Sequence, residues 1–230
     1  MTTSDGGGGA GDQRPPELLV RLHEPALPEP LFRRLLRAVQ RVGDERLRDT
    51  YQTTFWFDLR EPPASIVEEA ALALLQRIPG REKVAGVEWW LSRMSPNDVR
   101  VDFHRDQDER LSRAGGPIVH PTTSSVLFLN RVKGGALAVT REPPCEENPA
   151  LAPEHLDFDL VLPRPNRFVV FGGDLTHGVL DANNEIPTRR LPGTARRRLT
   201  IPLNWWDHRP TGVPGFAEAR IYPALALRRR

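Results

Sequence analysis

The sequence contains very little cysteine and very little lysine. Cys145 is the only cysteine among 230 residues, which excludes an internal disulfide framework and a zinc site built from cysteines. Lys83 and Lys133 are the only lysines, so nearly all basic residues are arginines, and the formal net charge is only +2. A basic stripe interleaved with aromatic residues, which is typical of nucleic-acid-binding proteins, is also absent. We therefore expect no nucleic-acid partner.

Long apolar runs are missing as well. No stretch approaches the ~20 consecutive apolar residues that a membrane-spanning helix needs. The N-terminus has no basic region followed by an apolar run, the pattern of a secretory signal. From these two absences we expect a cytoplasmic protein with no membrane partner. The apolar fraction of 39% is ordinary for a globular chain, and the length predicts a single domain.

The first part of the chain predicts helices that support a core formed further on. Residues 1–16 are rich in glycine and predict a disordered tail, and the domain itself is expected over residues 17–206. Within 17–83, apolar residues at helical spacing predict one helix from Pro28 to Gly43 and a second that starts at the capping pair Ser65 and Glu68. Short strands are expected over 18–22 and 51–59, and residues 207–230 predict a tail packed on the surface.

From residue 84 the pattern changes to short apolar stretches separated by turn residues. Such spacing predicts a mainly β core, as a sandwich or barrel, over residues 84–206. Two longer polar segments, 107–121 and 141–156, are expected to be loops that cover a functional site. The expected strands are 84–94, 99–105, 124–130, 135–140, 157–162, 167–172, 176–180 and 197–206.

One of these expected strands carries candidate metal ligands. Alternation along Val101–Asp106 places His104 and Asp106 on one face, so that an imidazole and a carboxylate point the same way. His177, far downstream, is a candidate third ligand. Two histidines and one carboxylate on one side of a metal are the ligand set of non-haem Fe(II) oxygenases. Asp102 and Asp108 remain alternative carboxylates.

The last expected strand carries a second group of polar residues. Leu199, Ile201 and Leu203 share one face, whereas Arg198 and Thr200 lie on the other. A barrel whose interior is lined with polar residues in this way predicts a functional site there and not a core. Arg196 shares the face of Arg198 and remains an alternative to it.

Taken in order, His104-x-Asp106, His177 and Arg198-x-Thr200 resemble the 2-oxoglutarate/Fe(II)-dependent dioxygenases. Two surrounding motifs strengthen the resemblance and look loosely like its prolyl-hydroxylase-like branch: Ser125–Asn130 before Gly134-Gly135, and Pro165–Phe171 before Gly173-Asp174-x-x-His177-Gly178-Val179. The resemblance covers residues 84–206. The fold that it implies is a double-stranded β-helix, a cupin-like jelly roll, supported by the N-terminal helices. Residues 17–206 would then form one catalytic domain.

The resemblance also implies roles for these residues. His104, Asp106 and His177 would hold Fe(II), Arg198 would bind the distal carboxylate of 2-oxoglutarate bidentately, and Thr200 would add a hydroxyl. With O2 as co-substrate, the enzyme would be a hydroxylase that releases succinate and CO2. We expect a small-molecule or amino-acid-type substrate ahead of a protein side chain. Asp106 argues against a halogenase, which must free that metal position for halide.

Two other classes of function remain open on the sequence alone. The same ligands could serve a cupin-like metal-binding protein without oxidative activity, although the presence of Arg198 argues against it. An interaction module with a structural interior would instead need apolar residues at positions 104, 106, 177 and 198, where the sequence has His, Asp, His and Arg.

Overall fold

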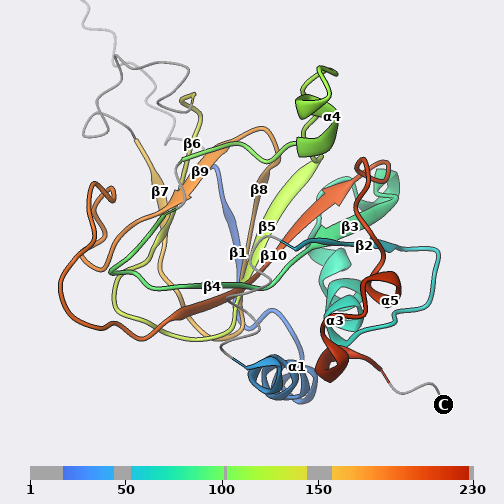
Figure 1. The fold of residues 1–230 in the computed structure, drawn as a ribbon, viewed down its shortest axis with the longest axis horizontal. Helices are drawn as coiled ribbons and strands as arrows, with labels where there is room; N and C mark the ends of the chain where they lie inside the picture. Colours follow the sequence, from blue (N-terminus) through green and yellow to red (C-terminus); the bar gives the residue numbers. More distant parts are fainter. Residues whose placement is uncertain (1–17, 44–52, 101–102, 144–156, 228–230) are drawn as a thin grey trace, which may run out of the picture.

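The fold is mainly β, with helices added at its N-terminal and C-terminal parts (Figure 1). The structure is a computed structural model, and it describes residues 18–43, 53–100, 103–143 and 157–227. The expected disordered tail, Asp102 and most of the expected loop 141–156 lie outside the described residues. In the part of the chain that the structure describes, no helix has the length and apolar character needed to cross a membrane.

The larger of two antiparallel sheets has the strand order β1-β8-β5-β10-β3-β2, and β4 also pairs with β10. Its longest strand, β10, lies at the centre and pairs with β3, β4 and β5. The strands are β1 (Arg21–His23), β2 (Phe55–Asp58), β3 (Gly86–Trp89), β4 (Ser92–Met94), β5 (Thr123–Phe128), β8 (Arg167–Gly172) and β10 (Arg198–Trp206).

The smaller sheet consists of β7 (Asp159–Val161), β6 (Leu137–Thr140) and β9 (Thr176–Val179), in that order. Apolar residues of β6 and β7 form a buried cluster with those of β5 and β8 in the larger sheet, so the two sheets face each other. We call the side of the larger sheet that faces this cluster its inner face. The cluster consists of Val126, Phe128, Leu137, Val139, Val161, Val169 and Phe171.

Two helices cover the outer face of the larger sheet, and both were expected from the sequence. Helix α1 (Glu29–Val42) ends at Gly43, whose φ of 79° is easily reached only without a side chain. Helix α3 (Ile66–Leu74) begins with the predicted capping box, in which Ser65 and Glu68 satisfy each other's backbone N–H groups. Short 3-10 turns follow α3 at η1 (Leu75–Arg77) and η2 (Arg81–Lys83).

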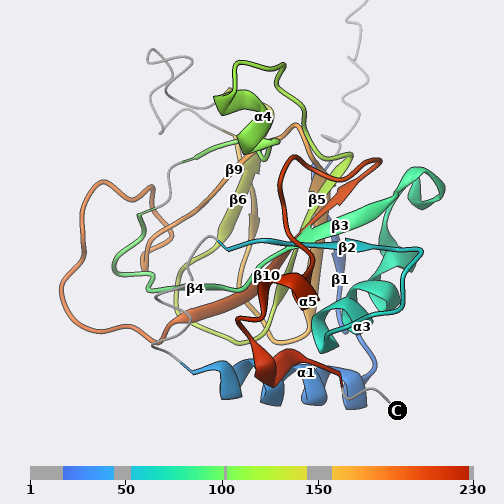
Figure 2. The same ribbon diagram turned by 45° about the vertical axis from the view of Figure 1, so that its right-hand side comes forward.

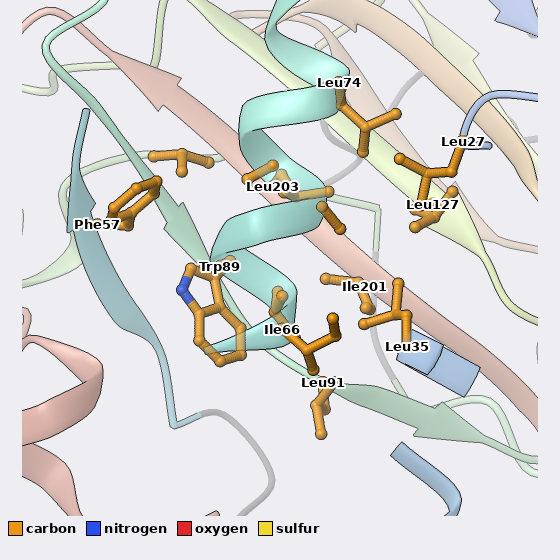
Figure 3. Close-up of a cluster of buried hydrophobic side chains, with 14 of the residues drawn as sticks. Leu27, Leu35, Phe57, Ile66, Leu74, Trp89, Leu91, Leu127, Ile201 and Leu203 are labelled. Atoms are coloured by element: carbon orange, nitrogen blue, oxygen red, sulfur yellow. The ribbon is translucent and has the colours of Figure 1, made fainter. Parts of the chain in front are cut away.

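The main core lies between these helices and the sheet. In Figure 3, Ile66 and Leu74 of α3 lie among apolar side chains of the strands, including Trp89 of β3 and Ile201 of β10. Alternation along β10 explains the division, because Ile201, Leu203 and Trp205 are buried in this core, whereas the residues between them point to the inner face. The sheet is thereby apolar on one face and partly polar on the other.

The segment after β10 differs from the expected surface tail. Phe216 in α5 (Phe216–Ala219), Tyr222, and Leu225 in η4 (Pro223–Leu225) are all buried in the main core. Figure 2 shows this C-terminal segment next to α1, with the sheet behind. Aromatic and leucine side chains at irregular spacing fill the remaining gap between helices and sheet, and such irregular spacing gives no periodic signal in the sequence.

The expected strand 99–105 was also not found as such. Within its described part, His104 makes a single antiparallel bridge to His177, and residues 105–107 have no regular structure. The following loop contains a short helix, α4 (Glu109–Arg113), capped by the Asp108 carboxylate, which accepts a hydrogen bond from the N–H of Leu111 at 2.9 Å. The other expected strands are present, although the stretch 84–94 is divided into β3 and β4 and most bounds differ by a few residues.

Candidate active site

The two candidate histidine ligands are joined through their backbones. The N–H of His104 donates to the carbonyl of His177 at 3.0 Å, and the N–H of His177 donates back at 2.9 Å. Next to them, the ring of Phe103 lies so close to Gly178 that a Cβ there would be 2.8 Å from it. Glycine at 178 therefore allows the segment that carries His104 to dock on β9. The imidazole centroids lie 4.6 Å apart.

Two side chains from elsewhere orient Asp106, the candidate carboxylate ligand. The hydroxyl of Ser124 on β5 donates to Asp106 Oδ2 at 2.7 Å. The Nδ1–H of His120 donates to the backbone carbonyl of Asp106 at 2.6 Å. The first contact orients the carboxylate and the second holds the backbone that carries it, even though residues 105–107 are irregular.

His177 is held with one particular ring nitrogen toward Asp106. Its Nδ1–H donates to the carbonyl of Leu175 at 3.2 Å, and its Nε2 lies 3.5 Å from Asp106 Oδ2. A hydrogen bond at one imidazole nitrogen fixes the tautomer and leaves the other nitrogen free for a metal. Burial lowers the pKa of His177, and the Asp106 carboxylate opposes this shift. The neutral imidazole, which is the form that binds a metal, is favoured.

Together, His104, Asp106 and His177 form a group that could hold a metal ion. Each offers one ligand atom, and the three atoms lie within 4.8 Å of one another. His104 Nε2 and Asp106 Oδ1 are 3.8 Å apart, and 44% of the His104 side chain is exposed. Two imidazoles and a carboxylate suit Fe(II), and three protein ligands leave further positions for other molecules. The donor set therefore fits such an ion.

A buried guanidinium lies on the same inner face of the sheet. Arg198, at the start of β10, is only 3% exposed, and it lies over the ring of Phe128 at 4.9 Å from the centroid. Its Nη1 donates to the hydroxyl of Thr200 at 3.2 Å, whereas its Nε is buried without a hydrogen-bond partner. Burial lowers the pKa of Arg198 to about 10. A charged group that is buried without an anion suits a carboxylate ligand.

The alternatives from the sequence lie in other places. Arg196 is exposed and lines a hollow of about 380 Å³ beside α1, together with Leu36 and Arg197. Asp108 caps α4 and also accepts a hydrogen bond from the N–H of Thr211 at 2.7 Å. Asp102 lies outside the described residues. The structure thus brings together His104, Asp106 and His177, and it buries Arg198 against Thr200.

Sequence reasoning missed the residues that orient the candidate ligands. Ser124 lies within an apolar stretch that we expected to be a strand, and alternation on it would have placed Ser124 on the inner face. His120 lies in the expected loop 107–121, and its contact with the backbone of Asp106 leaves no sequence signal. Glu88, a charged residue inside the stretch 84–94, was the clearest available signal of a further polar position.

Comparison with protein-family models gave no match. Comparison with curated protein sequences likewise gave none. Among solved structures, the non-haem α-ketoglutarate-dependent carbocyclase SnoK from nogalamycin biosynthesis is similar at a TM-score of 0.51. It is 11% identical, over 93% of this chain and 90% of that chain. This likeness shows a shared fold.

Two further solved structures align over most of their length at lower TM-scores. A prolyl-4-hydroxylase from Pseudomonas putida has a TM-score of 0.47 and 19% identity, over 84% of this chain and 89% of that chain. HygX from Streptomyces hygroscopicus, with nickel and 2-oxoglutarate bound, has a TM-score of 0.45 and 12% identity, over 85% of this chain and 84% of that chain.

Proposed function

We propose that this protein is an Fe(II)- and 2-oxoglutarate-dependent oxygenase. The observation that carries the proposal is the meeting of His104, Asp106 and His177 within 4.8 Å. The buried Arg198, whose Nε has no hydrogen-bond partner among the described residues, supports it, because a metal site alone would not need such a group. The two facing antiparallel sheets are consistent with a double-stranded β-helix, the fold that the resemblance implies.

In this proposal His104, Asp106 and His177 hold Fe(II), which when bound supplies the activation of O2 for oxidation of the substrate. Ser124 and the Leu175 carbonyl fix the orientation of Asp106 and His177, so that the ligand atoms need little reorganisation. Asp106 occupies one metal position, and the expected reaction is therefore hydroxylation and not halide transfer. Succinate and CO2 are the expected products of 2-oxoglutarate.

Arg198 and Thr200 bind the distal carboxylate of 2-oxoglutarate. The guanidinium offers a planar set of donors that matches a carboxylate, and its burial over Phe128 excludes competing water. In such surroundings the interaction is stronger than it would be in solvent. The substrate is proposed to be a small molecule or an amino-acid-type compound.

The test uses the full chain with Fe(II) and 2-oxoglutarate under anaerobic conditions. The wild type should show the weak visible absorption band of a 2-oxo acid chelated to iron. His104→Ala should lose iron binding. Arg198→Ala should keep iron and bind 2-oxoglutarate at least about tenfold more weakly, since a charge-assisted pair is worth roughly 1.5–3 kcal/mol.

Arg197→Ala is the matched control, because Arg197 is exposed and immediately precedes Arg198. It should leave both affinities unchanged. Arg196→Ala tests the alternative carboxylate partner. Iron binding without the band in the wild type would contradict the oxygenase and favour a cupin-like metal-binding protein. Unchanged iron affinity in His104→Ala would contradict the assigned metal site.

A further inference from the structure

A row of side chains crosses the inner face of the larger sheet next to the candidate metal ligands. Asn204 on β10 lies directly opposite Ser124 on one side and Glu88 on the other. The row continues from Ser124 to Phe171, and from Glu88 to Trp56. Residues directly opposite one another on neighbouring strands point to the same face. Glu88 and Asn204 therefore face the same side as Ser124, which binds Asp106.

The surroundings of Glu88 are built from buried residues. Asn204 is 4% exposed. The indole of Trp206 is fully buried and lies next to Glu88. The Trp56 ring covers Gly86, where a Cβ would be 2.3 Å from it. Glu88 itself is partly exposed, and the Trp206 indole lies beside its carboxyl group.

The charges that shift the pKa of Glu88 are negative. The charged groups that act most strongly on it are the carboxylates of Asp106 and Asp108. Burial, followed by this repulsion, raises the pKa of Glu88 to about 7, while hydrogen bonding from Thr54 and the nearby Trp206 indole opposes the shift. A divalent ion held by Asp106 would offset that carboxylate and favour ionised Glu88. The position therefore favours a positively charged ligand group.

We propose that Glu88 and Asn204 bind the substrate of this site, and that the substrate carries a basic amine. The inference rests on the proposed oxygenase function in that it calls the bound molecule a substrate. The binding of an amine at Glu88 does not itself depend on that function. Glu88 pairs with the ammonium group, and the Asn204 amide accepts or donates a further hydrogen bond to a polar group nearby.

The register also limits the size of the substrate. Glu88 and Ser124 are separated by two strand spacings, with Asn204 between them, which corresponds to about 10 Å between their backbones. The glutamate side chain shortens the span that the substrate must bridge. The amine should thus lie only a few bonds from the carbon that is oxidised, as it does in an amino-acid-type or small amine-bearing molecule.

The probe for the test is n-butylammonium chloride, with 1-butanol in sodium chloride as the matched neutral compound. The full chain, loaded with diamagnetic Zn(II) in place of iron and with 2-oxoglutarate, carries ¹³C at its glutamate carboxyl carbons. Glu88→Gln removes the resonance of Glu88 and assigns it, and Glu88→Asp gives a second, independent assignment. The measured quantity is the titration midpoint of Glu88.

Saturating n-butylammonium should lower the midpoint by about 1 pH unit, because a nearby cation favours the carboxylate, and 1-butanol should leave it unchanged. Glu82→Gln, which changes an exposed glutamate in η2, should preserve the shift. No shift with n-butylammonium, or an equal shift with 1-butanol, overturns the proposal. The iron–2-oxoglutarate band separates the two ideas: a band without the shift removes the amine site alone, and the shift without a band removes the oxygenase alone.

Discussion

Single polar residues on the inner face differ in how far their hydrogen bonds are satisfied. Asp106 is bound by Ser124, and its backbone by His120, within the protein itself. Within the described residues, Arg198 Nε is instead buried without a hydrogen-bond partner. An unsatisfied buried donor costs about 1–3 kcal/mol. A ligand that accepts a hydrogen bond at such a position removes this cost. The groups whose hydrogen bonds are already satisfied are instead held in place before a ligand binds.

Ser124→Ala should weaken metal binding without removing a ligand. Loss of the 2.7 Å hydrogen bond frees the Asp106 carboxylate to rotate, and the loss of such a supporting contact reduces metal affinity by about 10–100-fold. Titration of the metal-free full chain with Fe(II) or Zn(II) measures the change.

Ser125→Ala is the control for this variant. Its hydroxyl lies on the opposite face of the sheet and bonds the Leu203 carbonyl and the Trp205 indole. It should lower stability while leaving metal affinity unchanged. Equal metal affinities in Ser124→Ala and the wild type would show that Asp106 does not need this support.

Glu88→Gln should change how the stability of the metal-free protein depends on pH. Because the folded pKa of about 7 lies above the ordinary 4.5, the folded state holds the proton more tightly. The carboxyl therefore destabilises the fold progressively from about pH 4.5 to 7, and the cost is constant above. Between these pH values the free energy of unfolding of the variant should rise relative to that of the wild type by about 1–2 kcal/mol, after allowance for partial exposure.

Urea unfolding of both proteins at pH 5 and pH 8 measures this gain. The stability difference between them should be larger at pH 8. A difference that is the same at both values would mean that Glu88 titrates normally in the folded protein.

At the scale of elements, β10 shows what the sequence can and cannot predict. Its alternation correctly placed Ile201 and Leu203 on one apolar face, and the structure buries that face in the main core. The capping box at Ser65 likewise predicted the start of α3. The segment around Asp106 was expected to be a strand, yet its conformation depends on the tertiary contacts of Ser124 and His120. Alternation describes only contacts that recur along one element, and these two do not.

At the scale of the whole molecule, the supporting helices and the candidate site lie on opposite faces of the larger sheet. Helices α1 and α3 and the C-terminal segment cover the outer face of the larger sheet, and the candidate site lies on its inner face. The N-terminal part also supplies both end strands of the sheet order, β1 and β2. The sequence predicts a supporting part followed by a core. In the structure the two are interleaved, because the first and last segments of the chain complete the same sheet and the same core.

Phe216→Ala should therefore destabilise the entire domain. The Phe216 ring is 6% exposed and packs edge-on against Phe55 at a centroid distance of 5.6 Å, with Trp89 at 5.7 Å. Removing such a side chain costs about 3–5 kcal/mol. Urea unfolding measures it, with Leu160→Ala as control because Leu160 is 53% exposed. A loss below about 1 kcal/mol would mean that the C-terminal segment only lies on the surface.

The paired backbone bonds between His104 and His177 have a consequence for metal binding as a thermodynamic linkage. The two imidazoles are carried by residues whose backbones are hydrogen-bonded to each other. Any opening of the segment at 103–106 therefore moves the two imidazoles apart. An ion bound between them raises the free energy of that opening by RT ln(1 + [M]/Kd). The binding free energy of the ion and the added resistance of this segment to opening are then linked, so that a measurement of either one reports on the other.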